Sequence, residues 1–523
     1  MRTHRYQRGM ALVIATLMLL ACIGVLLAIG LVGAAGGAGR ERASLAALAE
    51  AREALIAYAA DHPINSVVGP GYLPCPDLDD DGWAEATCGS QNGDSGQADR
   101  LGRLPWKTLG LADLRDGYGE RLWYAVSSKY KGLLNCGVSR ACLDMTPDAA
   151  LGTISVRDNA GSIIHDGTIA QAYRADAGGA VAVVIAPGPP LARAAADGSE
   201  GALQRRECVP GECDASGRCV TQPPQRAAHC DSRNFLDKAP GARYGDEDNA
   251  DFVDRNDAAG RPRNVNGFIH GPLTLPDGRI AVNDRLAVIA YRDVMPRIRL
   301  RVALEVAHCL RGYATRPENR GRYPWATPAC AQSAAQWDAR AGVLFGRIPD
   351  TPFASSGAML ERWWSAAEPA SANDACRIAA PPGDAADEGS TAGRDGNSWW
   401  NAWKPYVFYA LARGFAPDAG ASGCAQGTCL DLADPTGRAL GTSKQFAVVV
   451  AGATLARDGF VQSRAGANVS EVRQWLEAAN AELEGTAGCT AAPAFSCEAR
   501  ASCTRVTSGS GNRGFNDVVV AFP

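Results

Sequence analysis

The chain has 523 residues, which favours two or three domains because a single hydrophobic core stops growing at about 250–300 residues. Its net charge of −4 provides no basic footprint, so the composition argues against nucleic acid as a partner. Of the 17 cysteines, Cys22 lies in an apolar run near the N-terminus. The remaining 16 all follow that run, and their even number favours disulfides formed in an oxidising compartment.

The first predicted element is an apolar helix. Residues 10–34 carry no charged side chain, and about 20 helical residues suffice to cross a bilayer. Between Leu45 and Ala59, apolar residues recur at steps of three and four, which is the spacing of one helix face. No proline occurs before His62. The sequence therefore predicts one long helix whose first half spans a membrane and whose second half packs on a soluble head.

A short leader precedes this helix. Residues 1–9 contain three arginines and end at Gly9, directly before the apolar run. This arrangement resembles the leader and N-terminal helix of type IV pilins and type II secretion pseudopilins. In that family a prepilin peptidase cuts after the glycine and methylates the new N-terminus, so the resemblance implies processing between Gly9 and Met10. It also implies packing against other pilins or pseudopilins through the helix.

The same resemblance implies a location and a place in a filament. The N-terminus would lie in the cytoplasm, with one pass through the inner membrane and the heads in the periplasm or outside the cell. The family usually has glutamate as the fifth mature residue, whereas this chain has Ile14, as in the large tip pseudopilin. Three other interpretations of the segment stay open: a cleaved signal peptide, a lipoprotein signal ending at Cys22, and an uncleaved anchor.

An internal repeat divides the rest of the chain. Several segments recur in the same order, which a chance match would not produce. The clearest pairs are RLWYAVS (121–127) with KPYVFYALA (404–412), CGVSRACLDM (136–145) with CAQGTCLDL (424–432), GAVAVVIAPG (179–188) with KQFAVVVAGA (444–453), NFLD (234–237) with QWLE (474–477), and VNDRLAVIA (282–290) with FNDVVVAF (515–522). We therefore predict a first head over residues 35–290 and a second over 291–523.

Each copy begins with a helical pattern and continues with short strands separated by long loops, an order typical of the α+β class. The predicted fold is thus α+β, a long N-terminal membrane-spanning helix with two tandem pilin-like heads. In each head the resemblance implies an antiparallel sheet packed on the helix, with long disulfide-tied loops. Four cysteine pairs bracket such loops and are the disulfide candidates: Cys136 with Cys142, Cys424 with Cys429, Cys75 with Cys88, and Cys309 with Cys330.

One acidic stretch has the form of a cation loop. Residues 77–82 read D-x-D-D-D-G, so Asp77, Asp79 and Asp81 alternate as in the first half of a calcium loop. The closing glutamate is missing, because Cys88 takes the twelfth place and the nearest acid is Glu85. Calcium binding and a solvated acidic turn both stay open, and no other cofactor is expected.

The sequence contains no HExxH, GxSxG or Walker A motif, so we predict that the protein is not an enzyme. We predict a minor pilin or pseudopilin, a structural or adhesive subunit at the tip of a type IV pilus-like or type II secretion-like filament. The alternative is a membrane-anchored periplasmic or surface protein that binds a ligand and is not assembled into a filament.

Overall fold

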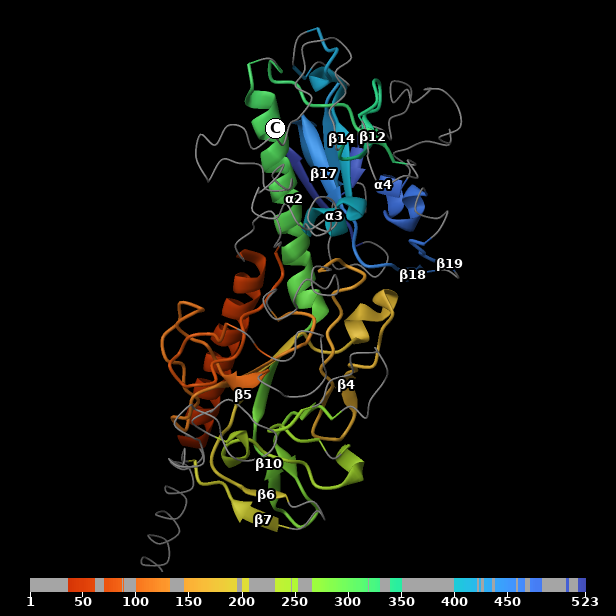
Figure 1. The fold of residues 1–523 in the computed structure, drawn as a ribbon. Coiled ribbons are helices and arrows are strands. Elements are labelled where there is room, and N and C mark those ends of the chain that lie inside the picture. The colour runs from red at the N-terminus through yellow and green to blue at the C-terminus, as the bar shows by residue number, and fades with distance from the viewer. Residues whose placement is uncertain are drawn as a thin grey trace, which may run out of the picture.

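In a computed structural model, the chain forms two lobes stacked along one long axis (Figure 1). The structure describes residues 36–61, 70–86, 88, 100–131, 145–194, 200–206, 231–245, 247–252, 266–317, 319–329, 339–349, 399–420, 423–424, 428–434, 438–457, 460–465, 471–481, 505–507 and 516–523. We call the lobe up to residue 290 the first unit and the lobe from residue 291 the second unit.

The first unit packs a helix on an antiparallel sheet. The helix covers residues 36–61, and its side chains Leu48, Ala51 and Leu55 are at most 2% exposed, as the three- and four-residue spacing requires. The sheet has the order β1-β2-β5-β11, and all its pairings are antiparallel. Its strands are β1 (Leu101–Arg103), β2 (Trp123–Val126), β5 (Ala182–Ala186) and β11 (Arg285–Ile289).

Both faces of this sheet are buried. Tyr124 and Val184 face the core that contains the helix, whereas Trp123 and Val183, their neighbours in the chain, face a second core formed by loops. This alternation is the two-residue period of a strand. Because both faces of the sheet are buried, the sequences of β2 and β5 are nearly continuous apolar runs.

The second unit repeats the plan. Helix α2 (Tyr291–Thr315) packs on a sheet with the order β12-β13-β14-β17-β21, again antiparallel throughout. The strands are β12 (Thr327–Pro328), β13 (Phe345–Arg347), β14 (Val407–Leu411), β17 (Phe446–Val450) and β21 (Val518–Phe522). The repeated sequence segments occupy corresponding places, since β2 matches β14, β5 matches β17 and β11 matches β21.

Short strands and turns line the loops. In the first unit they are β3 (Val156–Arg157), β4 (Ile163–His165), β6 (Ala192–Ala194), β7 (Glu200–Leu203), β8 (Phe268–Ile269), β9 (Leu273–Thr274), β10 (Ile280–Val282) and the 3-10 turns η3 (Ala172–Ala177), η4 (Ser232–Asn234) and η5 (Ala242–Tyr244). In the second unit they are β15 (Leu430–Ala433), β16 (Ala439–Lys444), β18 (Ala456–Arg457), β19 (Phe460–Val461), β20 (Arg505–Thr507), the helices α3 (Trp399–Trp403) and α4 (Ala478–Ala481), and the 3-10 turns η7 (Lys404–Tyr406), η8 (Arg413–Phe415) and η10 (Val472–Gln474). The small sheets β4-β3-β8 and β16-β15-β20 each contain one antiparallel and one parallel pairing.

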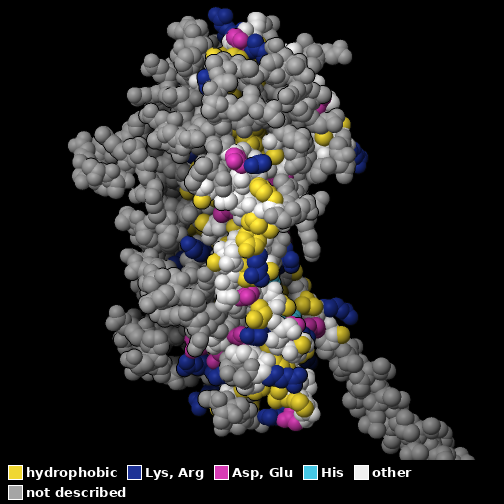
Figure 2. Space-filling model, turned by 90° about the vertical axis from the view of Figure 1, so that its right-hand side faces the viewer, with side chains coloured by type: hydrophobic (Ala, Val, Ile, Leu, Met, Phe, Trp, Pro, Cys, Tyr) yellow, Lys and Arg dark blue, Asp and Glu magenta, His cyan; other side chains and the backbone are white. Residues whose placement is uncertain are grey.

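The two units share one hydrophobic core. A single cluster of buried apolar residues runs from Ala47 on the first helix to Leu476 in the second unit. A single residue, Ala290, separates the end of β11 from the start of helix α2. Two ion pairs join α2 to the first helix, Arg52 with Asp293 at 2.8 Å and Arg297 with Glu53 at 2.9 Å. On the face drawn in Figure 2, apolar side chains follow the long axis, with acidic and basic side chains between them.

The structure corrects the predicted fold class and the predicted location. Residues 10–34 lie outside the described residues, and among the residues that are described no long membrane-spanning N-terminal helix is seen. None of the helices in the described ranges combines the length and the apolar composition that crossing a membrane requires, because even the first helix carries charges such as Arg40, Glu41 and Arg42. Regular structure there is mainly β-sheet with two long helices. The mainly β structure of the described residues, without a membrane-spanning helix among them, contradicts the predicted fold class. The same lack of a membrane-spanning helix there contradicts the predicted single-pass position in the inner membrane.

Candidate metal site

An acidic loop follows the first helix and is fixed to the sheet at its start. The Tyr124 hydroxyl on β2 donates to the carbonyl of Pro74 at 3.0 Å. Asp77 exchanges two backbone hydrogen bonds with Arg103 on β1, at 3.0 and 2.8 Å. Gly102 makes this close approach feasible, because a Cβ atom there would lie 2.6 Å from the Asp77 carbonyl oxygen. The loop therefore begins as an extra edge segment of the sheet.

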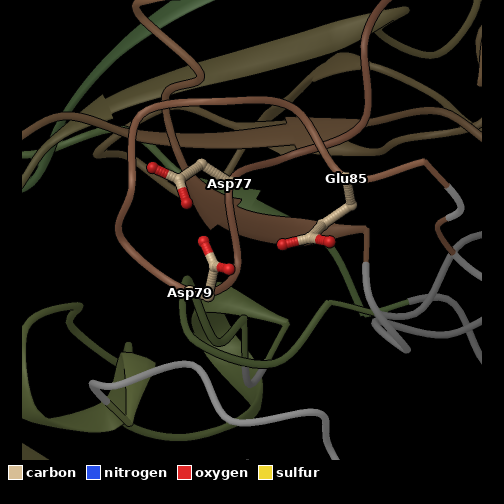
Figure 3. Close-up of side chains that lie close together, drawn as sticks. All are labelled: Asp77, Asp79 and Glu85. Atoms are coloured by element: carbon tan, nitrogen blue, oxygen red, sulfur yellow. The ribbon is translucent and has the colours of Figure 1, made fainter.

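Three carboxylates of this loop converge. One oxygen each from Asp77, Asp79 and Glu85 lies within 4.8 Å of the others, and Figure 3 shows the three groups around a common space. Glu85 returns to the start of the loop because its backbone amide donates to Pro76 and its carboxylate accepts from the Leu78 amide, both at 3.3 Å. The loop thus gathers a set of oxygen ligands of the kind that hard cations prefer.

The ligand set differs from the predicted one by one residue. Asp77 and Asp79 belong to the group, whereas Asp81 does not, and its Oδ1 accepts from the Trp83 amide at 2.7 Å. Asp79 and Asp81 are both exposed, so exposure does not distinguish them. Glu85 takes the third place. The sequence signal for Glu85 was its being the nearest acid after the acidic run, and the chain reversal that brings it back could not be read from spacing.

Asp77 is the most constrained member. Its side chain is 1% exposed, and its Oδ2 accepts from the Gly82 amide at 2.8 Å. Its Oδ1 is buried and has no hydrogen-bond partner among the residues that the structure describes. Burial raises the pKa of Asp77 to about 6, with Asp80 and Asp81 adding repulsion. Keeping the Asp77 carboxylate ionised in this buried position therefore costs free energy, which a bound cation would offset.

Backbone conformation and packing shape the turn. Asp80 and Gly82 adopt positive φ angles of 64° and 88°, a region where glycine is favoured. A Cβ atom on Gly82 would lie 2.7 Å from the Trp106 ring, so only glycine fits against this indole. Asp80 pairs with Arg121 at 2.7 Å, and the Lys107 ammonium donates to the Asp81 carbonyl. These contacts hold the loop closed on its outer side.

A disulfide encloses the whole loop. Cys75 is bonded to Cys88, so all three clustered carboxylates lie within one covalent ring of the chain. The second unit has no such acid at the corresponding place, because β12 puts Thr327 opposite Arg347 just as Asp77 lies opposite Arg103. Within the described ranges, the candidate site therefore belongs to the first unit.

The other predicted site residues are distributed as follows. Cys424 is bonded to Cys429, and Cys309 is also disulfide-bonded. The processing residues Gly9 and Met10 and the cysteines Cys136, Cys142 and Cys330 lie outside the described residues.

Sequence reasoning missed a buried carboxyl pair in the first unit. Asp237 and Asp284 are both 0% exposed, and the Asp237 amide donates to Asp284 Oδ2 at 2.8 Å. The Asn283 amide donates to Asp237 Oδ2 at 2.6 Å, and side-chain amides of Gln204 and Asn249 donate to the two carboxyl groups at 3.0 and 2.8 Å. Burial raises the pKa of Asp237 to about 6 and that of Asp284 well above the usual range.

The second unit repeats this pair. The Glu477 amide donates to Asp517 Oδ2, and the Asn516 amide donates to Glu477 Oε2, both at 3.1 Å. Gln462 and Asn480 supply the matching side-chain donors at 3.0 and 3.1 Å. Burial and the neighbouring Glu477 raise the pKa of Asp517 well above its usual range. The sequence signal for these pairs was the match of NFLD with QWLE and of VND with FND. The hydrogen bonds of the paired carboxyl groups indicate a structural role, in which they hold neighbouring loop segments together.

Comparisons with known proteins were negative. A scan against protein-family models, a search of curated proteins and a search of solved structures each found no match to this chain. Inference about its role therefore starts from its own residues and their geometry.

Proposed function

We propose that the chain is a non-catalytic subunit of a pilin-like filament, with a structural or adhesive role at its tip. The observation that carries this proposal is the repeated unit, a helix packed lengthwise on an antiparallel sheet. The first of these helices is described from residue 36, shortly after the leader and apolar run that resemble those of pilins. A prepilin peptidase would process the chain after Gly9.

The way the two units are joined supports a structural role. They share one core, and the loop at Pro147 and Asp148 of the first unit contacts the second unit through Tyr291 and Tyr406 at 2.9 and 3.1 Å. A shared core of this kind joins the two lobes into one elongated body and restricts their motion relative to each other. An elongated, stiff body with two lobes fits the end of a filament better than its repeating shaft, because stacked copies would collide.

The buried polar groups support a non-catalytic role. In the described part of each unit, the paired carboxyl groups accept hydrogen bonds from backbone amides and from asparagine and glutamine side chains. Arg206 and Arg464 donate to backbone carbonyls beside these pairs. Through these hydrogen bonds the carboxyl groups hold loop segments in place, and the carboxyl groups themselves are fully buried.

Filament isolation tests the proposal. We expect the wild-type chain to co-purify with sheared filaments and to be labelled by immunogold at one filament end. The variant Gly9→Val should be absent from filaments, because processing needs the glycine. A matched control is Gly36→Ala, which changes an exposed helical glycine whose Cβ would touch nothing within 4 Å. Equal filament incorporation of Gly9→Val and wild type would contradict the proposal and favour the alternative, a surface protein that binds a ligand without assembly.

A further inference from the structure

The acidic loop carries an inference that does not depend on filament assembly. Carboxylate oxygens of Asp77, Asp79 and Glu85 lie within 4.8 Å of one another, a separation at which like charges repel strongly. Figure 3 shows the Asp77 and Asp79 carboxylates directed toward one another and that of Glu85 reaching into the same space. Asp79 is exposed and Glu85 is half-buried, so water screens part of this repulsion, and a cation among the oxygens would offset the rest.

An independent observation points to a ligand. Among the described residues, Asp77 Oδ1 is buried without a hydrogen-bond partner on a side chain that is only 1% exposed. Buried carboxylate oxygens are usually hydrogen-bonded or bound to a metal. Asp284 Oδ1 and Asp517 Oδ1 also lack such a partner there, but within the described ranges only Asp77 belongs to a cluster of three acidic side chains. In the described part of the second unit, Thr327 holds the place that corresponds to Asp77. The fold therefore does not need a carboxylate here.

The basic side chains around the loop are engaged elsewhere. Arg121 pairs with Asp80 at 2.7 Å and with Asp113 at 3.0 Å. Lys107 donates to the Asp81 carbonyl and lies over the Trp106 ring. The guanidinium of Arg103 lies over the Trp123 and Phe235 rings, 4.3 Å from each centroid. Each of these three basic groups thus has partners other than the carboxylates of Asp77 and Asp79.

We propose that the loop between Cys75 and Cys88 binds one calcium ion through Asp77, Asp79 and Glu85. The ligands are all oxygen atoms on a turn, and calcium accepts six to eight oxygens in flexible geometry, including backbone carbonyls and water. Magnesium demands a stricter octahedron and retains most of its water, so it fits a loop with three converging carboxylates less well. The disulfide holds both ends of the loop together before the ion binds.

Terbium luminescence on the purified, disulfide-intact chain tests this inference. Terbium replaces calcium at such sites, and Trp106 packs against Gly82 of the loop, close enough to sensitise the ion. We expect tryptophan-excited emission that saturates at one terbium per chain. Calcium should displace the terbium, whereas an equal concentration of magnesium should not. Isothermal titration with calcium then gives the affinity directly.

Variants assign the ligands. Asp77→Asn and Glu85→Gln should each weaken calcium binding about tenfold or more, since even outer-shell changes at metal sites cost 10–100-fold. Asp81→Asn removes the same charge from the same loop outside the group, so its affinity should stay within about twofold of the wild type. Glu85→Gln keeps an acceptor for the Leu78 amide, so it tests the site even if Asp77→Asn fails to fold.

Three outcomes would overturn the inference. One is the absence of any calcium-displaceable terbium signal at millimolar calcium. Another is equal displacement by magnesium, and the third is an Asp81→Asn loss as large as that of Glu85→Gln. The first would mean that the acidic loop is a solvated turn, the second that it does not select calcium, and the third that binding follows the total charge of the loop and not the three named ligands.

Discussion

Arg464 of the second unit donates a hydrogen bond to Asp148 of the first unit at 2.8 Å. Asp148 also accepts from the Thr454 amide at 2.8 Å and from the Tyr406 hydroxyl at 3.1 Å. The Arg464 side chain is 6% exposed, so this pair belongs to the interior of the junction. One aspartate in a loop of the first unit thus receives three donors from the second unit.

The junction predicts a stability effect. Asp148→Ala should lower the free energy of unfolding by about 3 kcal/mol, because it leaves the Arg464 guanidinium buried without its carboxylate. Urea unfolding followed by tryptophan fluorescence measures the change. Arg473→Ala is a suitable control, since it breaks an exposed pair with Glu471 and should leave the midpoint unchanged. Equal midpoints for Asp148→Ala and wild type would show that the junction contributes little.

The buried carboxyl pairs predict a pH dependence. Asp237, Asp284 and Asp517 bind a proton more tightly in the folded chain than in the unfolded chain, because burial raises their pKa. The stability they contribute is therefore complete below the unfolded pKa and is lost as the pH rises through the folded values, which for Asp237 is about 6. We expect the free energy of unfolding to fall through Asp237 as the pH rises from the ordinary aspartate value of 3.8 to about 6, and to fall further above pH 6 through Asp284 and Asp517.

Asparagine variants test the origin of that slope. Asp284→Asn and Asp517→Asn keep an oxygen acceptor for the amides of Asp237 and Glu477 but remove the titrating group. Each variant should flatten the decline in stability that accompanies a rise in pH above the ordinary aspartate value of 3.8. Asp277→Asn is the control, because Asp277 is exposed and its pKa is lowered by hydrogen bonds with Arg279. A slope that stays as steep in both buried-site variants would assign the pH dependence to other groups.

The two described disulfides should differ in strength. Replacing Cys75 and Cys88 by alanine removes a bridge over a sequence separation of 13, and the chain-entropy relation gives a loss of about 3 kcal/mol. Replacing Cys424 and Cys429 removes a bridge over a separation of 5, for which the loss is about 2 kcal/mol. Chemical denaturation of both double variants measures the difference. The opposite ranking would mean that native packing, not loop closure, decides their contributions.

An arginine held between aromatic rings recurs in both units. The Arg347 guanidinium lies 3.8 Å from the Phe408 centroid and 4.6 Å from that of Trp475. Arg347→Met keeps the length but loses the cation–π contacts, so we expect a loss of about 1–2 kcal/mol in thermal or urea unfolding. Arg473→Met is the control, since Arg473 is exposed and 6.0 Å from its ring. If Arg473→Met lowered the free energy of unfolding as much as Arg347→Met does, the cation–π contacts of Arg347 would not explain its contribution.

Much of the repeated fold could be predicted from sequence. Strands β2, β5, β14 and β17 lie within segments that aromatic and β-branched residues mark as strands, and α2 begins at Tyr291, where the repeat puts the second copy. Local composition decides such elements because each must bury an apolar face. The membrane-spanning helix was the main error: an apolar run alone suggested it, and no described helix supports it.

The sites were harder to predict because their partners are distant in the chain. Asp237 and Asp284 are separated by 47 residues, and Asp148 and Arg464 by 316 residues. No spacing rule connects such pairs before the fold is known. The loop of Asp77 was visible as a motif, but the replacement of Asp81 by Glu85 depends on a chain reversal beside Pro76.

The mature N-terminus tests the central claim most directly. Intact-mass and N-terminal peptide analysis of the chain purified from its own cells should give a polypeptide that begins at Met10 and carries a methyl group on its amine. A chain that retains Met1, or one that begins after the apolar run of residues 10–34, would contradict the proposal of a pilin-like subunit.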